Sequence, residues 1–308
     1  MKHWLAAFRL RTLPLAVSSI LVGSALARFA KNCWHTYHFS DSVLVLALLT
    51  AILLQILSNL ANDLGDHQHG TDNKNRIGPQ RAVQSGAISP AAMRRAMIIC
   101  GLLAFLSGCA LITVALGFST ITFAFLALGL AAIGAAVKYT FGRKPYGYSG
   151  LGDVSVFLFF GIVGVCGTFY LHTSTFEWPV LLPATAFGLF SVGVLNVNNM
   201  RDITNDATSG KRTLVVRMGS RNAKIYHFVL IVLAIACLIA FILLFDGTWL
   251  LDGSRLLWIS LLALPGFIIH LKRVLTNTEP RLLDPQLKTL AMTTFLTAIL
   301  FSLGLILA

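Results

Sequence analysis

Long apolar stretches, separated by short polar segments, dominate the chain. A helix needs about 20 residues to cross about 30 Å of hydrocarbon, and apolar runs close to that length occur nine times. They lie at 13–30, 43–64, 96–118, 120–138, 152–171, 180–200, 225–245, 256–271 and 289–307. Inside a bilayer a helix satisfies its own backbone N–H and C=O groups. The pattern therefore predicts an all-α, polytopic membrane protein with nine transmembrane helices.

The composition supports this class and excludes others. Of the 308 residues, 56% are hydrophobic and only 12% are charged, whereas about a quarter of the residues in soluble proteins are charged. Aqueous enzyme domains and disordered tails are therefore poor interpretations. The five cysteines show no CxxC spacing, and four of them lie inside apolar runs, which is typical of small core residues.

The positions of the cations predict an orientation. With nine spans, 21 of the 24 Lys and Arg residues fall on the side of the N-terminus, and only Arg28, Lys31 and Arg255 fall on the other. Because cytoplasmic loops of membrane proteins are enriched in Lys and Arg, the N-terminus is predicted to be cytoplasmic and the C-terminus outside. The same rule accounts for the net charge of +12 without a nucleic-acid partner.

Two similar polar segments indicate an internal repeat. Residues 59–66 at the end of the second span carry Asn59, Asp63 and Asp66, and residues 196–206 at the end of the sixth carry Asn198, Asp202 and Asp206. Both ends are predicted to be cytoplasmic, and a Gly-containing basic loop follows each. We interpret 1–308 as one domain with a pseudo-repeat of four helices (about 1–138 and about 139–271) and a ninth helix at about 289–307.

The acidic residues of these segments are candidates for a metal site. At 100° per residue, the Asn and both Asp lie within about 60° on one helix face in the first segment and within about 80° in the second, so two carboxylate faces are able to converge. Clustered oxygen ligands without Cys suit Mg²⁺, which commonly binds carboxylates together with substrate phosphates. The candidate ligands are Asn59, Asp63, Asp66, Asp72, Asn198, Asp202 and Asp206.

Basic residues beside these acids predict an anionic ligand. The candidates for binding a diphosphate are Lys74, Arg76, Arg81, Arg201 and Lys211. Carboxylates that hold Mg²⁺ within a ring of Lys and Arg describe such a site. The alternative for any one of these groups is a solvated helix cap, and the charge rule for cytoplasmic loops explains any one cation equally well.

Several motifs resemble the UbiA superfamily of intramembrane aromatic prenyltransferases over nearly the whole chain. These are Asn62-Asp63-x-x-Asp66, Asp202-x₃-Asp206 and Gly210-Lys211-x-Thr213. Further motifs resemble the menaquinone-pathway branch of the superfamily: Arg9-x-Arg11-Thr12-Leu13-Pro14, Gly70-Thr71-Asp72, Arg76 to Arg81, Pro145 to Asp153, and Asn198 to Arg217. One position departs from the superfamily, because Gly70 stands where a third acid is common and Asp72 follows two residues later.

The resemblance implies a fold and an activity. It implies nine helices around a central cavity, with Asp63, Asp66, Asp202, Asp206 and Lys211 as catalytic residues and Mg²⁺ as the cofactor. The implied reaction transfers a polyprenyl group from polyprenyl diphosphate to 1,4-dihydroxy-2-naphthoate, with loss of CO₂ and diphosphate, and gives demethylmenaquinol. The implied location is the bacterial cytoplasmic (inner) membrane. Candidates for binding the acceptor are Lys138, Tyr139, Arg143, Lys144 and Asp153.

Two other functions stay open from the sequence. The first is prenyl transfer to 4-hydroxybenzoate, as in ubiquinone biosynthesis. The second is secondary transport, since transporters also contain internal repeats and intramembrane polar groups. Transporter sites lie near the middle of the bilayer, however, whereas these acids lie at predicted helix ends, which favours the enzyme.

Overall fold

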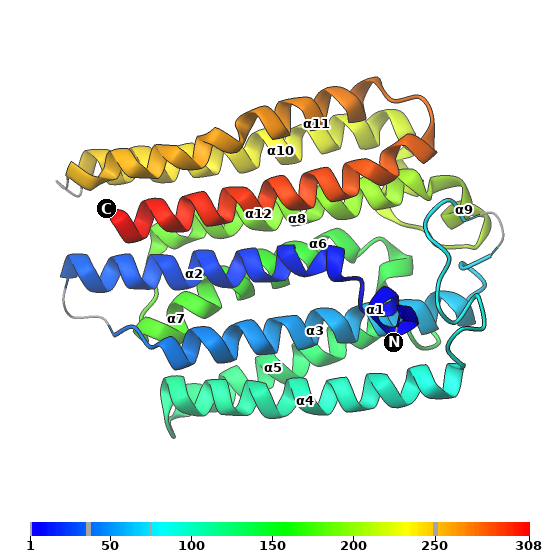
Figure 1. Ribbon diagram of the computed structural model, residues 1–308, viewed down its shortest axis with the longest axis horizontal. Helices are drawn as coiled ribbons and strands as arrows, with labels where there is room; N and C mark the ends of the chain where they lie inside the picture. The colour runs from blue at the N-terminus through cyan, green and yellow to red at the C-terminus, as the bar shows by residue number, and fades with distance from the viewer. Residues whose placement is uncertain (1, 35–37, 74–75, 249–251) are drawn as a thin grey trace.

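The computed structural model describes residues 2–34, 38–73, 76–248 and 252–308, and within them long helices run side by side (Figure 1). Across these ranges nine helical segments are long and apolar enough to cross a membrane. The prediction of an all-α protein with nine spans is therefore confirmed. In Figure 1 the first and last described residues lie toward opposite ends of the bundle, as an odd number of crossings requires.

The first half of the chain contains α1 (Lys2–Phe8), η1 (Leu10–Thr12), α2 (Leu13–Trp34), α3 (Asp41–Gln68), α4 (Pro90–Leu116), α5 (Thr120–Lys138), η2 (Tyr146–Ser149), α6 (Gly152–Val156) and η3 (Phe157–Gly167). The second half contains α7 (Thr168–Thr173), η4 (Trp178–Val180), α8 (Leu181–Arg201), α9 (Ile203–Thr208), α10 (Leu214–Thr248), η5 (Asp252–Ala263), α11 (Leu264–Thr276), η6 (Pro280–Leu283) and α12 (Asp284–Leu307).

Local sequence signals set several of these bounds. The side chain of Ser89 accepts a hydrogen bond from the backbone N–H of Ala92, and Pro90 occupies the first turn, so α4 begins there. Gly117 has φ of 60° and ends α4, because the left-handed region suits glycine. The result is the tight turn between α4 and α5. Pro265 lies in the first turn of α11, directly after the 3₁₀ helix η5.

Three spans differ from their predicted form. The run at 256–271 begins in the 3₁₀ helix η5 and becomes α-helical only at Leu264, where α11 begins. The run at 225–245 belongs to α10, which begins already at Leu214 and bends at Gly219, where φ is 77°. The run at 152–171 is not one regular α-helix, because the π-helix η3 separates α6 from α7. Hydropathy reports only burial in lipid, so it does not distinguish hydrogen-bond spacings within an apolar run.

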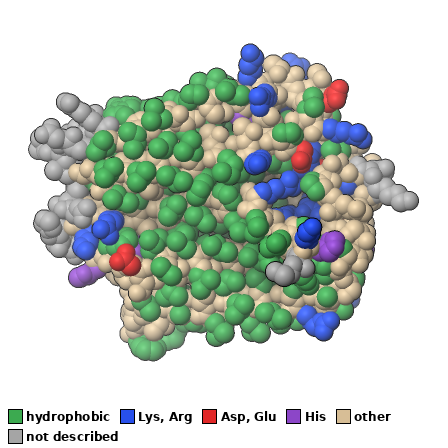
Figure 2. Space-filling view, in the orientation of Figure 1, with side chains coloured by type: hydrophobic (Ala, Val, Ile, Leu, Met, Phe, Trp, Pro, Cys, Tyr) green, Lys and Arg blue, Asp and Glu red, His purple; other side chains and the backbone are tan. Residues whose placement is uncertain are grey.

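The outer surface is apolar where a bilayer would lie. Figure 2 shows hydrophobic side chains over the broad middle of one face, while Lys and Arg gather toward its right-hand end. Large apolar side chains that are more than half exposed include Leu102, Leu106, Phe123, Leu262 and Ile268. Soluble proteins do not expose such extensive apolar surface, so this is a multi-pass membrane protein.

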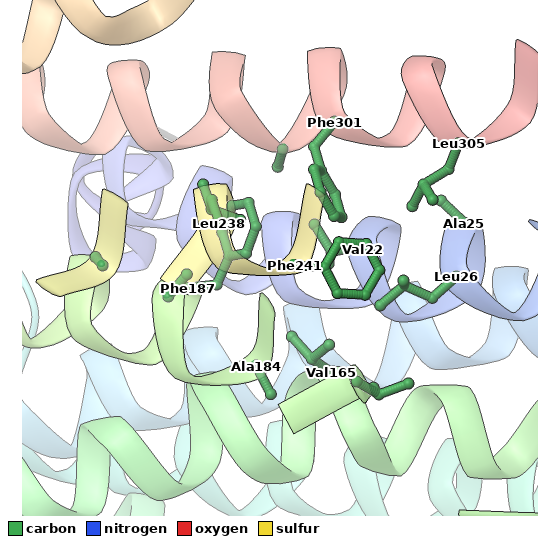
Figure 3. Packing of buried hydrophobic residues seen from close by; sticks show 14 of the residues in the cluster. Val22, Ala25, Leu26, Val165, Ala184, Phe187, Leu238, Phe241, Phe301 and Leu305 are labelled. Carbon is green, nitrogen blue, oxygen red and sulfur yellow. The ribbon is translucent and has the colours of Figure 1, made fainter. Parts of the chain in front are cut away.

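The main apolar core joins α2, η3, α8, α10 and α12. Figure 3 shows Phe187, Phe241 and Phe301 from three of these helices pointing toward one another. A Cβ atom on Gly161 of η3 would lie 2.6 Å from the carbonyl oxygen of Ala184 and 2.9 Å from Cα of Gly188 on α8. The two helices therefore approach to backbone contact. A second core lies between α3 and α4 around Leu57, Leu60 and Met93, and the cavity described next has walls from both groups of helices.

Candidate active site

A cavity of about 400 Å³ lies between the helices, with walls from α2, α3, α4, α5, η3, α8 and α12. On α3 it follows one face, from Ala47 through Leu54 and Ser58 to Asn62 and Asp66. At a rise of 1.5 Å per residue this face is roughly 28 Å long. One end of the cavity is charged and the remainder is mostly apolar, so it joins a polar site to a long hydrocarbon-compatible channel.

At the charged end, the structure brings the two acidic segments together around Lys211. Its Nζ lies 3.8 Å from Oδ1 of Asp66 and 3.7 Å from Oδ1 of Asp206. The amide of Asn205 also donates to the backbone oxygen of Thr71 at 2.8 Å, which ties α9 to the loop after α3. Residues more than 130 positions apart thus form one site.

Burial and charge shift the ionisation of these groups. Burial raises the pKa of Asp206 to about 6, against the effect of the Lys211 ammonium, and its Oδ2 accepts no hydrogen bond from the described residues. Burial alone would lower the pKa of Lys211, but the carboxylates of Asp66 and Asp206 raise it above its ordinary value. Lys211 is therefore a permanent cation, and Asp206 keeps a free oxygen for a further positive charge.

Tyr148 supports this arrangement from η2. Its hydroxyl donates to Oδ1 of Asp66 at 2.9 Å and lies 2.6 Å from Oγ1 of Thr71. The ring lies beneath Lys211, with Nζ 5.3 Å from the ring centre. Burial and the Asp66 charge raise the pKa of Tyr148 above its ordinary value, so it stays a neutral donor that orients Asp66.

Asp63 has different partners from Asp66. Both of its carboxylate oxygens accept hydrogen bonds of 3.2 Å, from the backbone N–H groups of Ala82 and Val83. It is fully buried and is not among the residues that line the cavity. The side chain thus anchors the loop that carries Arg81, and its predicted role as a metal ligand stays a prediction.

Arg201 likewise bonds to its own neighbours. Its guanidinium donates to both oxygens of Asp202, at 2.9 and 2.6 Å, and is ion-paired with Asp284 at 2.5 Å. It also donates to Oδ1 of Asn198 at 3.0 Å. Burial alone would raise the pKa of Asp202, but the hydrogen bonds and charge of Arg201 hold it below its ordinary value. Arg201 is not part of the cavity wall, so it clamps α8 to α12.

The loop after α3 organises two further cations. Oδ1 of Asp72 lies 3.0 Å from Nε of Arg76 and 3.8 Å from Nε of Arg81. Burial raises the pKa of Asp72 to about 6, and burial together with the charge of Arg76 lowers the pKa of Arg81 to about 10. Of these three residues only Arg81 lines the cavity. Lys74, predicted to bind diphosphate, lies outside the described residues.

The predicted amide ligands do reach the cavity. Both Asn59 and Asn198 line it. Asn59 donates through Nδ2 to the backbone oxygen of Phe8 and to Oγ1 of Thr12, each at 3.0 Å. Its Oδ1 is the atom left to face a ligand, although Gln55 donates to it at 3.3 Å.

Of the predicted acceptor-binding residues, only Tyr139 lines the cavity. Lys138, Arg143 and Lys144 are exposed outside it. Asp153 is buried outside it and accepts a hydrogen bond of 3.0 Å from Tyr226. Burial raises the pKa of Tyr139 above its ordinary value, so its hydroxyl stays protonated.

Sequence reasoning missed several residues of the cavity wall. The clearest is Arg9, whose backbone has φ of 48° at the break between α1 and η1 and whose Nη2 is buried without a hydrogen-bond partner in the described part of the chain. Others with charged or amide side chains include Arg11, Asn62, Asn199 and Lys288. The motif that begins at Arg9 was a signal for two of them, but hydropathy and spacing did not show that both arginines reach the cavity.

The donor set fits a divalent metal at Asp66 and Asp206. Among the described residues no three His, Cys, Asp or Glu side chains form a metal-binding group. Yet Asp66 lines the cavity, Asp206 has a buried oxygen without a hydrogen-bond partner in the described ranges, and the amides of Asn59, Asn62 and Asn198 add neutral oxygens. Carboxylates and amide oxygens without thiolates suit a hard cation such as Mg²⁺.

Comparison with known proteins gives the same family. The model of the UbiA prenyltransferase family matches residues 16–288. The chain is 45% identical over 306 residues to the 1,4-dihydroxy-2-naphthoate octaprenyltransferase of Haemophilus influenzae, covering 99% of this chain and 96% of that protein. The fold is similar to that of the apo UbiA homolog from Aeropyrum pernix, with a TM-score of 0.69 at 17% identity over 97% of this chain and 98% of that one. It is also similar to the UbiA homolog from Archaeoglobus fulgidus bound to DMAPP and Mg²⁺, with a TM-score of 0.58 at 18% identity over 97% and 99%. The chain belongs to the UbiA prenyltransferase family.

Proposed function

We propose that the protein is a Mg²⁺-dependent 1,4-dihydroxy-2-naphthoate polyprenyltransferase of menaquinone biosynthesis in a bacterial cytoplasmic membrane. It transfers a polyprenyl group from polyprenyl diphosphate to the naphthoate, with loss of diphosphate and CO₂. The observation that carries the proposal is the cavity that joins the charged groups around Lys211 to a long apolar channel along α3. The near full-length relative named for this reaction supports the choice of acceptor and suggests an octaprenyl chain.

The two ends of the cavity match the two parts of the donor substrate. Lys211, Arg81 and Arg9 supply positive charge for the diphosphate. The side chains of Leu54, Leu111 and Phe125 line the apolar part, where an isoprenoid tail is as well solvated as it is in lipid. The substrate then reaches from the polar helix ends into the hydrocarbon region.

Asp66 and Asp206 are the carboxylates that would hold Mg²⁺, with the amide oxygens of Asn59 and Asn198 beside them. When bound, the ion supplies positive charge to the diphosphate oxygens and so makes diphosphate a better leaving group. Tyr148 holds Asp66 in position, and Lys211 adds a fixed charge that needs no reorganisation during the reaction.

The chemistry then needs an enclosed, oriented acceptor. The allylic C–O bond breaks with its electron pair on the diphosphate, and the electron-rich ring carbon that carries the carboxylate forms a bond to the allylic carbon. The carboxylate leaves as CO₂, and the electrons of its C–C bond restore the aromatic ring. The side chains of Phe159, Phe160 and Val163 line the cavity and exclude water that would otherwise trap the allylic cation. The protonated hydroxyl of Tyr139 is available to donate to an oxygen of the acceptor.

Purified protein with octaprenyl diphosphate, Mg²⁺ and either 1,4-dihydroxy-2-naphthoate or 4-hydroxybenzoate tests this proposal. We expect turnover with the naphthoate, release of diphosphate and CO₂, and a product whose mass lacks the carboxyl group. Addition of EDTA is expected to abolish turnover and excess Mg²⁺ to restore it. Turnover with 4-hydroxybenzoate alone, or a product that retains the carboxyl mass, would contradict the proposed acceptor.

A further inference from the structure

Three cations on the cavity wall form no ion pair within the described residues: Arg9, Arg11 and Lys288. The charges of Asp66 and Asp63 act on Arg9, so Arg9 belongs with the cations near the acidic segments, and Arg11 and Lys288 remain. Arg11 of η1 and Lys288 of α12 both line the cavity, and both side chains are exposed. The two elements that carry them pack against each other. Among the ion pairs of the described residues, none involves either side chain. The charge of Asp284 acts on Arg11, but that carboxylate is ion-paired with Arg201 at 2.5 Å.

The cations near the acidic segments differ in this respect. Lys211 lies within 4 Å of Asp66 and Asp206, and Arg81 lies 3.8 Å from Asp72. Positive charge at that end is therefore partly balanced by the protein itself, whereas the charge of Arg11 and Lys288 is balanced by none of the described ion pairs. An unbalanced pair of cations on the wall of a binding cavity favours an anionic ligand.

The cavity wall that holds these cations also offers apolar surface for an aromatic ring. Leu15, Val194, Leu287 and Ala291 line the same cavity from α2, α8 and α12. Asn199 adds one amide from α8. Apolar walls with a few polar groups are typical of sites that orient a small ligand. An aromatic acid placed there would direct its carboxylate to the two cations.

The reaction itself requires two separate anion sites. The diphosphate and the acceptor carboxylate are both negative, and like charges in a cavity of low dielectric constant repel strongly. Cations on different walls allow both anions to bind at once. Lys138, Arg143 and Lys144, the sequence-based candidates for the acceptor carboxylate, do not line the cavity.

We propose that Arg11 and Lys288 bind the carboxylate of the aromatic acceptor and thereby select carboxylated acceptors. This inference rests on the proposed function, because it takes the acceptor to be an aromatic acid. The two residues are binding and specificity residues. They orient the ring and take no part in proton transfer.

Acceptors with and without the carboxyl group test the assignment. Arg11→Gln and Lys288→Gln keep a polar side chain of similar reach but remove the charge. Each is expected to raise KM for 1,4-dihydroxy-2-naphthoate on the order of tenfold. KM for the polyprenyl diphosphate stays unchanged, and so does turnover of 1,4-dihydroxynaphthalene, which lacks the carboxyl group. Arg281→Gln, an exposed residue of η6 outside the cavity, serves as the matched control.

Three results would overturn the inference. The first is an equal loss of turnover with both acceptors, which indicates damage to the fold or to a lipid contact. The second is a raised KM for the diphosphate substrate, which assigns the cations to the other anion. The third is a rise in KM for the naphthoate, without loss of turnover of 1,4-dihydroxynaphthalene, in Lys144→Gln but not in Lys288→Gln.

Calorimetric binding of each acceptor to the purified protein, without prenyl donor, separates this inference from the proposed function. Wild-type protein that binds the naphthoate through these two residues but does not turn it over contradicts only the proposed reaction. Wild-type protein that binds neither acceptor contradicts both.

Discussion

Asp63 and Asp66 lie one helical turn apart on α3 but contact different partners. Asp63 accepts two backbone N–H groups of the following loop, whereas Asp66 faces the cavity beside Lys211 and Tyr148. The sequence predicted one role for both, because their spacing puts them on one helix face. It could not separate them, since the difference depends on the path of a loop some 20 residues later.

Substituting each aspartate by asparagine separates an anchor from a ligand. Asp63→Asn removes one of two acceptor oxygens from a buried site and turns an amide NH₂ toward a backbone N–H. We expect it to cost about 1–3 kcal/mol of stability, with no change in the Mg²⁺ concentration needed for half-maximal activity. Asp66→Asn is expected to raise that Mg²⁺ requirement and to lower turnover by about a hundredfold.

Thermal unfolding in detergent and Mg²⁺ titration of activity measure the two effects. The variants serve as controls for each other, because each carries the same chemical change on the same helix. If Asp63→Asn raises the Mg²⁺ requirement as much as Asp66→Asn while unfolding like wild type, then Asp63 is a metal ligand, as the motif alone predicts.

Arg201 and Arg81 show the same limit at the residue scale. Residue type and charge predicted diphosphate binding by both, yet Arg201 is bonded to Asp202, Asp284 and Asn198, while Arg81 reaches the cavity. Asp284 lies 83 positions from Arg201, and nothing in the local sequence marks the two as partners. A sequence identifies the cations that could bind diphosphate, and the fold determines which of them are already paired with carboxylates of the protein.

At the scale of elements, the number and approximate bounds of the helices followed from hydropathy, whereas their geometry did not. The π-helix η3 occupies the middle of an apolar run that is long and apolar enough to cross a membrane, and hydropathy gives no sign of the change in helix type. A π-helix widens the spacing of side chains and is frequent at functional sites. Here it presents Phe159, Phe160 and Val163 to the cavity.

Gly161 tests whether the close packing of η3 on α8 matters. In Gly161→Ala the new Cβ would meet the Ala184 carbonyl at 2.6 Å, and backbone atoms are unable to rotate away. We expect the helices to separate, at a cost of about 1–3 kcal/mol, with reduced activity because η3 carries part of the cavity wall. Thermal unfolding and turnover check this.

Gly134→Ala on α5 is the matched control, because a Cβ there meets nothing within 4 Å. It is expected to unfold at or slightly above the wild-type temperature, since alanine favours helices over glycine. If both variants had the same unfolding temperature and the same turnover, the contact between η3 and α8 would tolerate an added methyl group.

At the scale of the whole molecule, the acidic segments, the N-terminal helix and the basic loops share one end of the bundle (Figures 1 and 2). This placement follows from the alternation of spans, which is why the sequence predicted that the two acidic segments meet. The division into two four-helix units stays a prediction. The channel along α3 was not derivable from hydropathy, because the residues that line it are as apolar as those that face lipid.

The orientation of this bundle in the membrane is the remaining prediction. The end that holds the acidic segments also holds 21 of the 24 Lys and Arg residues by the predicted alternation of spans, and such loops stay on the cytoplasmic side. Alkaline phosphatase fused after Ala308 is therefore expected to be active in bacterial cells, and green fluorescent protein at the same position to be dark. A fluorescent protein fused after Ser149, in the loop that follows the fourth span, is expected to fluoresce and controls for expression. Fluorescence of both the Ala308 fusion and the Ser149 fusion would contradict the ninth crossing. If alkaline phosphatase were instead active when fused after Ser149 and inactive when fused after Ala308, the protein would have the opposite orientation in the membrane.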